Sequence, residues 1–320
     1  MQTSRRIVYF NGCFVPEREA RLSIYDSALS FGDMAFEVTR TFHRQPFLLR
    51  EHLGRLFHSL AAMHIDPRLS VDELEQITLQ TLARNLPSES DDVDWNIIHN
   101  VSRGPAAGFF DAFSPDELRP TVLVSCFPLV QKMAGLAAAY DSGLDLVTVA
   151  QHALPHELLD ASIKNRSRWH YQLANLQARE QAAGSWPVLF DPDGYLTEST
   201  SANVFLVRDG VLLTPEPRNL LPGITRGVVL SLAPQLGAAC RETNLTADDI
   251  AAADELFLTS TSVGLIHART FQGRPVGDGR IGPLTRRVRE AFERQVGLDF
   301  AAQARAYALK VSAIAATGRR

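Results

Sequence analysis

"SWPVLFDPDGYLTESTSANVFLVRDGVLLTP" spans residues 185–215, and strand-like apolar runs alternate in it with turn signals. Asp193-Gly194 and Asp209-Gly210 are dipeptides that favour two-residue β-hairpin turns. The stretch therefore predicts two consecutive hairpins in the second half of the chain.

The residues around these hairpins predict further strands and helices. "LDLVTVA" (144–150) and "DELFLTSTSVGLIHA" (254–268) read as strands, and the second runs into a polar turn. Helical spacing follows residue 167, continues in "LPGITRGVVLSLAPQLG" (221–237) and returns in "GPLTRRVREAFERQVG" (282–297), which we expect to be the last long helix.

The first half predicts a second mixed set of elements. "IVYFNGCFV" (7–15) is a hairpin around Asn11-Gly12, and "MAFEVTRTFHRQPFLL" (34–49) is a second pair of strands. Two helices follow over residues 50–64 and 70–85, the latter with Ser70 as N-cap. "DWNIIHNVSRG" and "RPTVLVSCF" then read as strands.

Length and composition favour two domains. We expect a smaller N-terminal α/β domain over residues 1–130 and an Ala- and Gly-rich linker over residues 131–143. A larger C-terminal domain, which we expect to bind the cofactor, then covers residues 144–310, and a small, polar, frayed tail covers 311–320.

Charge and cysteine usage exclude several classes of protein. The net charge of −4 argues against nucleic acid and anionic membranes as partners, and no apolar run is long enough to span a bilayer. The 3 cysteines are few and far apart, which favours a cytoplasmic protein without disulfides. We expect no metal, because Pro155 interrupts the pair His152 and His156 and no third ligand is near.

Three features of the second half together suggest one cofactor. Lys164 lies where an irregular segment gives way to a helix, and Glu198 lies at a Ser/Thr-rich turn. Gly223 precedes a helix start that suits a phosphate, and "LTSTS" (258–262) is a second polar turn. Each feature alone is ordinary: a solvated lysine, a turn carboxylate, a helix cap. A lysine, a carboxylate and a phosphate cradle are nevertheless the parts that a pyridoxal phosphate site needs.

With these motifs, the chain resembles the fold-type IV pyridoxal-phosphate enzymes, or class IV aminotransferases. The similar blocks are "SFGDMAFEVTRTF…LLREHLGRL", "IK", "DGYLTESTSANVFLVRDGVLLTP", "LLPGITRGVV" and "ADELFLTSTSVGLI", in that order. The family includes branched-chain and D-amino acid aminotransferases, R-selective amine transaminases and aminodeoxychorismate lyase. The resemblance implies a two-domain α+β fold of the D-amino acid aminotransferase type, pyridoxal 5′-phosphate as cofactor, and a homodimer.

The resemblance also implies roles for individual residues. Lys164 matches the Schiff-base lysine, and Glu198 matches the carboxylate at the pyridine nitrogen. The other cofactor-binding positions that match are Arg55 and Ile224, Thr225, Ser260 and Thr261 for the phosphate, and Leu221 for the ring. Positions that match the substrate pocket are Phe31, Phe36, Arg40 and Arg168.

The resemblance implies transamination between an amino acid and a 2-oxo acid, as in branched-chain aminotransferases. Two alternatives stay open. An arginine at position 168 resembles aminodeoxychorismate lyases, which release pyruvate, and a non-catalytic protein could keep the fold. "PAAGFFDAF" after "VSRG" lacks the arginine and histidine of D-amino acid enzymes, which argues against that activity.

Overall fold

The structure, a computed structural model, describes residues 6–114 and 117–317 and divides the chain into two compact units. Unit 1 comprises Met1–Leu129 and Ile163–Arg168, and unit 2 comprises Val130–Ser162 and Trp169–Arg320. The short segment Ile163–Arg168 therefore packs with unit 1, although both of its sequence neighbours belong to unit 2.

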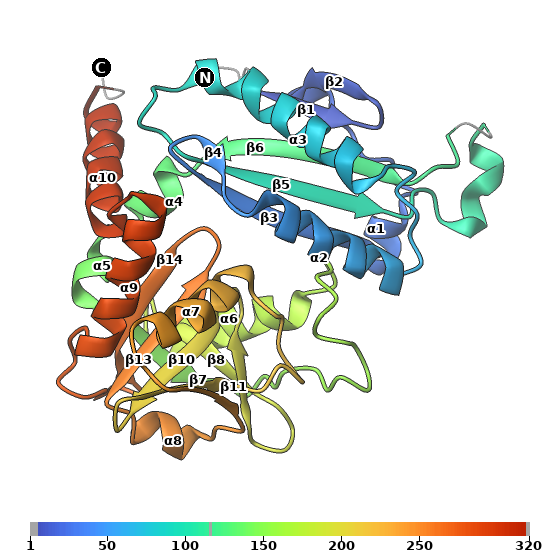
Figure 1. The fold of residues 1–320 in the computed structure, drawn as a ribbon. Coiled ribbons are helices and arrows are strands. Elements are labelled where there is room, and N and C mark those ends of the chain that lie inside the picture. The colour runs from blue at the N-terminus through green and yellow to red at the C-terminus, as the bar shows by residue number, and fades with distance from the viewer. Residues whose placement is uncertain (1–5, 115–116, 318–320) are drawn as a thin grey trace. The chain divides into compact units, whose positions relative to one another are not determined.

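Unit 1 is an antiparallel sheet in the order β2-β1-β6-β5-β3-β4, with helices α2 and α3 across one face (Figure 1). Its strands are β1 (Ile7–Phe10), β2 (Cys13–Pro16), β3 (Met34–Phe42), β4 (Gln45–Pro46), β5 (Trp95–Ser102) and β6 (Thr121–Pro128). Its helices are α1 (Ser27–Phe31), α2 (Leu49–Ala62) and α3 (Val71–Asn85), with short 3₁₀ turns at Glu17–Glu19, Leu86–Ser88 and Ala107–Ala112.

The local signals of the first half are confirmed. Asn11 and Gly12 both have positive φ, 47° and 99°, as a tight hairpin turn between β1 and β2 requires. Ser70 caps α3 and shares a capping box with Glu73, which satisfies two amide groups at the start of the helix.

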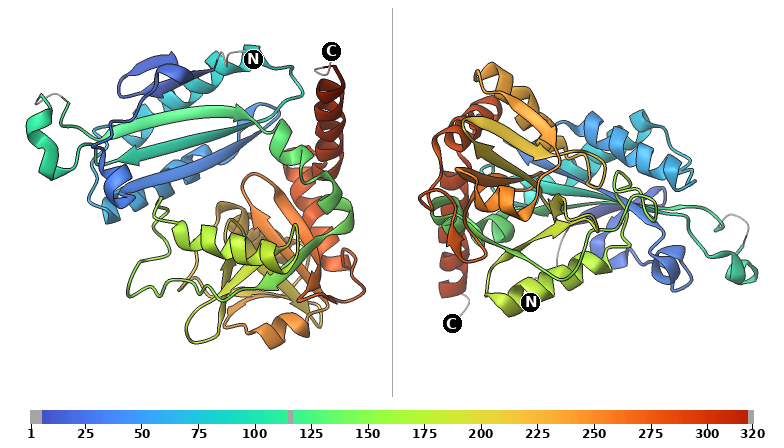
Figure 2. Two further views of the ribbon diagram at one scale, coloured as in Figure 1. Left: turned by 180° about the vertical axis from the view of Figure 1, so that it is seen from behind. Right: turned by 90° about the horizontal axis from the view of Figure 1, so that it is seen from below.

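The core of unit 1 lies between the sheet and its two helices. Alternate residues of the strands, such as Ile97 and Val124, pack with Leu53, Leu56 and Leu74 of the helices. Figure 2 (left) shows the opposite face of this sheet, with α2 and α3 behind it. Side chains at the even positions of β3 and β5 lie on that opposite face.

Unit 2 is built on a nine-stranded mixed sheet in the order β12-β11-β10-β13-β14-β7-β8-β9, with β15 beside β14. The strands are β7 (Leu144–Thr148), β8 (Trp186–Phe190), β9 (Leu196–Ser199), β10 (Asn203–Arg208), β11 (Val211–Pro215), β12 (Cys240–Thr243), β13 (Glu255–Ser260), β14 (Gly264–Phe271) and β15 (Arg274–Pro275). Both expected hairpins are confirmed: β8 pairs with β9, and β10 pairs with β11.

Helices cover both faces of this sheet (Figures 1 and 2). α7 (Ile224–Gln235) and α9 (Pro283–Val296) share a buried cluster with β10, β11, β13 and β14. α6 (Trp169–Gln181) packs against β7 and β8 on the other face. A short helix, α8 (Ala247–Ala251), precedes β13.

Two segments differ from the sequence-based expectation. The expected linker, residues 131–143, forms α4 (Val130–Ala134) and α5 (Ala137–Ser142). The expectation that residues 282–297 are the last long helix, followed by a frayed tail at 311–320, is wrong for the described residues. α10 (Phe300–Thr317) continues through residues 311–317, and residues 318–320 lie outside the described part.

α10 has one buried face. Several residues of this face are alanines, so the apolar pattern of the helix is weak in the sequence. Phe300, Ala301, Ala304 and Tyr307 are buried at helical spacing, and the helix packs against α4 and α5. Alanine also has the highest helix propensity. Within residues 6–114 and 117–317, no helix is both long and apolar enough to span a membrane.

Candidate functional site

The backbone around Lys164 forms an added strand along β3. The amide of Phe36 donates to the carbonyl of Lys164 at 2.9 Å, and the amide of Arg166 donates to the carbonyl of Met34 at 2.8 Å. Asn165, between these bonds, bridges β3 in antiparallel fashion. The irregular segment ahead of the helix is therefore held in place by a sheet edge.

Helix α2 supplies a second anchor for the same segment. The amide of Lys164 donates to Oγ of Ser59 at 3.0 Å, and that hydroxyl donates to the carbonyl of Arg55, one turn earlier, at 3.1 Å. The half-buried Lys164 side chain places Nζ 4.9 Å from the centre of the Phe36 ring. Unit 1 thus holds the lysine against α2 and an aromatic ring.

Arg55 itself is gripped by a buried carboxylate. Its Nε and Nη2 donate to the two carboxylate oxygens of Glu37 at 2.8 and 2.7 Å. Nδ1 of His52 lies 3.1 Å from the same carboxylate. This bidentate pairing fixes the plane of the guanidinium.

The electrostatics of this cluster keep Glu37 charged. Burial by itself raises the pKa of Glu37, but the nearby charge of Arg55, the hydrogen bonds from His52 and Arg55, and the charge of Lys164 hold it well below its ordinary value. Burial is the main cause that lowers the pKa of His52, against the pull of Glu37.

The expected pocket residues of unit 1 divide into two groups. Arg168 places Cζ 5.5 Å from the centre of the Phe36 ring, so it lies with Lys164 around this side chain. Phe31 ends α1 as an exposed side chain, and its carbonyl accepts a hydrogen bond from Ser167 at 3.1 Å. Arg40 is buried, with Nε donating to the carbonyl of Thr41 at 3.2 Å and Nη2 3.9 Å from Oδ2 of Asp94.

Glu198 is a buried carboxylate of unit 2. It is the residue before the last of β9 and accepts hydrogen bonds from the Tyr171 hydroxyl at 2.7 Å, the Leu221 amide at 3.2 Å and the Asn203 amide group at 3.3 Å. Only 5% of its surface is exposed. Such a group must be compensated for lost water, and these donors do so.

Asn203 joins this carboxylate to the segment before α7. Its Nδ2 also donates to the carbonyl of Leu221 at 2.9 Å. A Cβ on Gly223 would lie 2.0 Å from Oδ1 of Asn203, so any larger residue at that position would displace the Asn203 side chain from these hydrogen bonds. Asn203 also pairs across the sheet with Thr259, the residue before Ser260.

The expected phosphate residues lie at two element ends in unit 2. Ile224 and Thr225 open α7, and their N-cap, Gly223, contributes no side-chain hydrogen bond. The first amides of a helix carry positive potential and suit an anion. Ser260 and Thr261 are half-buried at the end of β13, against which α7 packs.

Two buried hydroxyls lie beside these residues. Oγ of Ser199 and Oγ1 of Thr259 have no hydrogen-bond partner among the described residues. Ser199 follows Glu198, and Thr259 precedes Ser260. Buried polar atoms seldom stay unpaired, so these two hydroxyls retain hydrogen-bonding capacity beside the expected residues.

Sequence reasoning missed several residues that hold the expected ones. They are Glu37, His52, Ser59, Tyr171 and Asn203. Glu37 did carry a signal, because an acidic residue inside the apolar strand "MAFEV" needs a buried partner. The contact between Ser59 and Lys164 joins residues 105 apart in sequence and carries no such signal.

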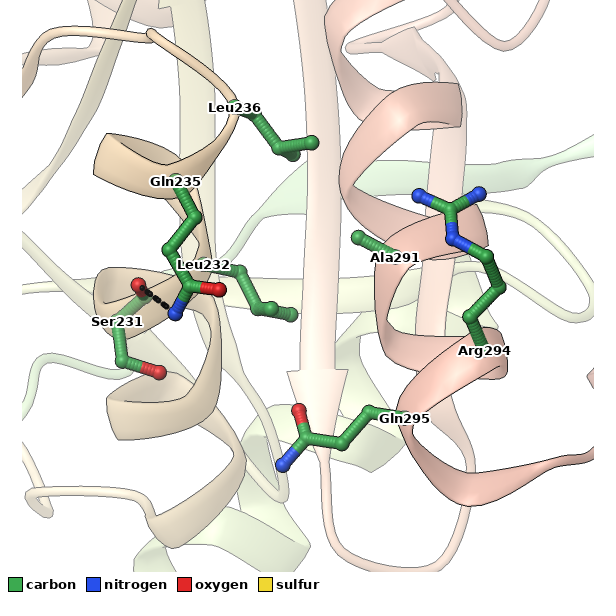
Figure 3. A pocket seen from close by; sticks show the side chains of 7 residues that line it. All are labelled: Ser231, Leu232, Gln235, Leu236, Ala291, Arg294 and Gln295. Carbon is green, nitrogen blue, oxygen red and sulfur yellow. Dashed lines mark hydrogen bonds between the residues drawn. The ribbon is translucent and has the colours of Figure 1, made fainter.

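A separate pocket of about 540 Å³ lies between the C-terminal half of α7 and α9 (Figure 3). Its lining residues are Ser231, Leu232, Gln235, Leu236, Ala291, Arg294 and Gln295. Gln235 donates to the Ser231 carbonyl at 2.9 Å, one turn back on the same helix. The pocket is lined by none of the expected site residues. Among the described residues, no group of three His, Cys, Asp or Glu side chains is arranged to hold a metal.

Comparisons with known proteins point in one direction. The family model described as amino-transferase class IV matches residues 34–271. The branched-chain-amino-acid aminotransferase of Escherichia coli (strain K12) is 30% identical over 293 residues, which cover 89% of this chain and 91% of that protein.

Solved structures give the same result. A crystal structure of the E. coli branched-chain amino acid aminotransferase has 27% identity and a TM-score of 0.80, and the match covers 90% of this chain and 94% of that one. The T.th. branched-chain amino acid aminotransferase complexed with N-(5′-phosphopyridoxyl)-L-glutamate has 27% identity and a TM-score of 0.79, covering 92% and 95%. The α+β fold expected from the motifs is confirmed.

Proposed function

Because this chain belongs to the class IV aminotransferase family and is an aminotransferase, we propose that it exchanges amino groups between an amino acid and a 2-oxo acid with pyridoxal 5′-phosphate as cofactor. Branched-chain amino acids are the donors that we propose first, since the E. coli relative carries that name. The observation that carries the proposal is Lys164, an amine held by β3 and α2 beside an aromatic ring.

The residues present fit this cofactor. In unit 2, buried Glu198 suits a protonated ring nitrogen, and the opening of α7 with Ser260 and Thr261 suits a phosphate. The unpaired hydroxyls of Ser199 and Thr259 are consistent with a polar ligand there. We propose Leu221 as the contact for the ring.

Unit 1 contributes the covalent and electrostatic parts of the proposal. Lys164 would hold the cofactor through its amine, and Arg55 would neutralise phosphate charge. Glu37 holds Nε and Nη2 of Arg55 and so fixes the orientation of the guanidinium. When bound, the cofactor supplies an electron sink for negative charge that develops at the α-carbon of the substrate.

The side chains then have distinct tasks. Once the substrate amine has displaced it from the cofactor, the free amine of Lys164 would remove the proton from the α-carbon of the substrate, and it would deliver a proton to the α-carbon of the second substrate in the reverse half-reaction. Glu198 keeps a proton on the ring nitrogen, because its negative charge stabilises the cation. Tyr171 and Asn203 orient that carboxylate. Phe31, Phe36, Arg40 and Arg168 are the residues that we propose around the substrate.

We also propose that the enzyme is a two-domain homodimer of the cytoplasm. Exposed apolar side chains at Ile24, Leu29 and Phe31, on and before α1, support a protein partner for this surface. The 3 cysteines are all free, which supports a reducing compartment.

A donor panel tests the function. The purified enzyme, loaded with cofactor, is mixed with leucine, isoleucine, valine or glutamate, and 2-oxo acid release is measured with and without 2-oxoglutarate. We expect turnover that requires both an amino donor and an oxo-acid acceptor. Pyruvate release from aminodeoxychorismate without an acceptor would assign the lyase instead, and inactivity with every donor would reject transamination.

A further inference from the structure

Arg166 stacks on Phe36 and is fixed by a neutral side chain. Its Cζ lies 3.8 Å from the centre of the Phe36 ring. Nε and Nη2 both donate to Oδ1 of Asn100, at 3.0 and 2.7 Å. A guanidinium that lies over a ring and donates two hydrogen bonds to one oxygen is held in a defined orientation.

The platform under Arg166 is built into the sheet. Phe36 on β3 and Asn100 on β5 are direct cross-strand partners, on the face away from α2 and α3. Lys164 and Arg166 are two apart in an extended segment, so both side chains lie on the same side of it. With Nζ at 4.9 Å and Cζ at 3.8 Å from one ring centre, the two groups lie within about 9 Å of each other.

The charge of Arg166 is not balanced inside the protein. Across residues 6–114 and 117–317, no carboxylate forms an ion pair with it, and its fixed partner is an uncharged amide. The residue as a whole is exposed, but the carbon of its guanidinium lies 3.8 Å from the centre of the Phe36 ring. Partial burial and the charge of Arg168 both lower the pKa of Arg166. An anion here would relieve a repulsion that the fold itself leaves in place.

The remaining donors of Arg166 suit a carboxylate. A guanidinium has five N–H donors, and two of them point to Asn100. The edge between Nη1 and Nη2 keeps an outward N–H on each nitrogen. Two parallel donors match the two oxygens of a carboxylate, which makes a bidentate pair.

We propose that Arg166 binds a carboxylate of the amino acid or 2-oxo acid substrate, close to the amine of Lys164. The proposal rests on the proposed function and adds a specificity-determining residue to it. Two carboxylates have the same chemistry: the α-carboxylate that every amino acid carries, and the side-chain carboxylate of a dicarboxylic substrate. The cofactor phosphate is a third anion, which the test must exclude.

Binding of unreactive acids tests the proposal without turnover. Isothermal titration calorimetry measures glutarate, 4-methylpentanoate and 4-methylpentanamide, which carry two, one and no carboxylates, on wild type and Arg166→Gln. We expect Arg166→Gln to weaken glutarate binding by about 10- to 100-fold, which is about 1.4–2.8 kcal/mol. An equal loss for 4-methylpentanoate assigns the α-carboxylate, and a loss for glutarate alone assigns the side-chain carboxylate.

Arg84→Gln is the matched control. Arg84 also stacks on a phenylalanine, with Cζ 3.9 Å from the Phe14 ring, and donates to the Gln80 carbonyl at 3.3 Å. It lies in the last turn of α3, where the helix end already favours a cation. Arg84→Gln should leave glutarate affinity unchanged. Arg166→Lys should keep part of the wild-type glutarate affinity, because lysine retains the positive charge.

Three results would overturn the proposal. They are unchanged glutarate affinity in Arg166→Gln, an equal loss for the uncharged amide, and a tenfold loss of pyridoxal 5′-phosphate affinity, which would assign Arg166 to the cofactor. Failure of the donor panel with Arg166-dependent glutarate binding would reject transamination alone. Successful transamination with Arg166-independent binding would reject only this inference.

Discussion

Replacing Glu37 by glutamine tests the buried cluster that holds Arg55. Glu37 has no exposed side-chain surface, and Arg55 and His52 expose 8% and 1% of theirs. The glutamine keeps the size but turns one acceptor into a donor that faces the guanidinium. Neutralising one partner of a buried ion pair typically costs about 3–5 kcal/mol, because the other charge stays buried. We expect a loss of this size in the free energy of unfolding of unit 1.

Urea denaturation followed by tryptophan fluorescence measures this loss. Trp95 is fully buried in the core of unit 1, whereas Trp169 and Trp186 belong to unit 2. A background with the latter two replaced by phenylalanine leaves Trp95 as the reporter. The stability difference follows from linear extrapolation of both curves to zero urea.

The pH dependence of the difference has a fixed sign. The folded-state pKa of Glu37 lies below the unfolded value of about 4.3, so the folded protein binds fewer protons. Glu37 therefore stabilises the fold fully above about pH 5, and this contribution is lost as pH falls below about 4. The gap between wild type and Glu37→Gln should shrink over that acidic range.

Glu73→Gln provides the control, because this carboxylate is exposed on α3 and pairs with Ser70. It should destabilise unit 1 far less than Glu37→Gln. Equal losses from the two variants, or a gap that does not change with pH, would refute the argument that Glu37 is charged and paired in the core.

Three further changes test the proposed cofactor residues. Glu198→Gln should lower kcat by about 10- to 1,000-fold with cofactor content retained, since an opposite charge about 4 Å away is worth up to roughly 4 kcal/mol at an effective dielectric of 20. An unchanged kcat would show that the charge of Glu198 has no part in the reaction. Arg55→Ala should weaken cofactor affinity by about 10- to 150-fold in equilibrium dialysis, and equal retention by both proteins would contradict it. Arg168→Leu should raise the pKa of the Lys164–cofactor linkage by about one unit, because a nearby cation opposes the protonated form of that linkage. Identical titration curves of wild type and variant, followed by visible absorbance, would place Arg168 outside the site.

Local structures formed by residues close together in sequence could be predicted. The turn at Asn11-Gly12 needs positive φ at two adjacent residues, and the capping box of α3 needs Ser70 and Glu73 three apart. Both depend on residues that are already neighbours, so their spacing is enough. α10 was missed because Phe300 and Tyr307 are buried by α4 and α5, and that packing cannot be predicted from the sequence of α10 alone.

The candidate site shows the same limit. Lys164 and Glu198 could be proposed because their chemistry and their turn context are visible in the chain. The residues that hold them could not. Tyr171 reaches Glu198 from 27 positions away, and Ser59 reaches Lys164 from 105 positions away. Such contacts are made by the packing of α2 and α6, which no local pattern specifies.

The attachment site of the cofactor can be read directly, because the chain has only three lysines, Lys132, Lys164 and Lys310. Lys132 lies in α4 and Lys310 in α10, so neither lies on the segment along β3. The protein is incubated with one equivalent of pyridoxal 5′-phosphate, reduced with borohydride, digested and mapped by mass spectrometry. We expect the phosphopyridoxyl group on the peptide that contains Lys164, and no such adduct in Lys164→Ala. A label on Lys132 or Lys310 in preference to Lys164, or equal labelling of the three, would contradict the assignment of Lys164 as the residue that carries the cofactor.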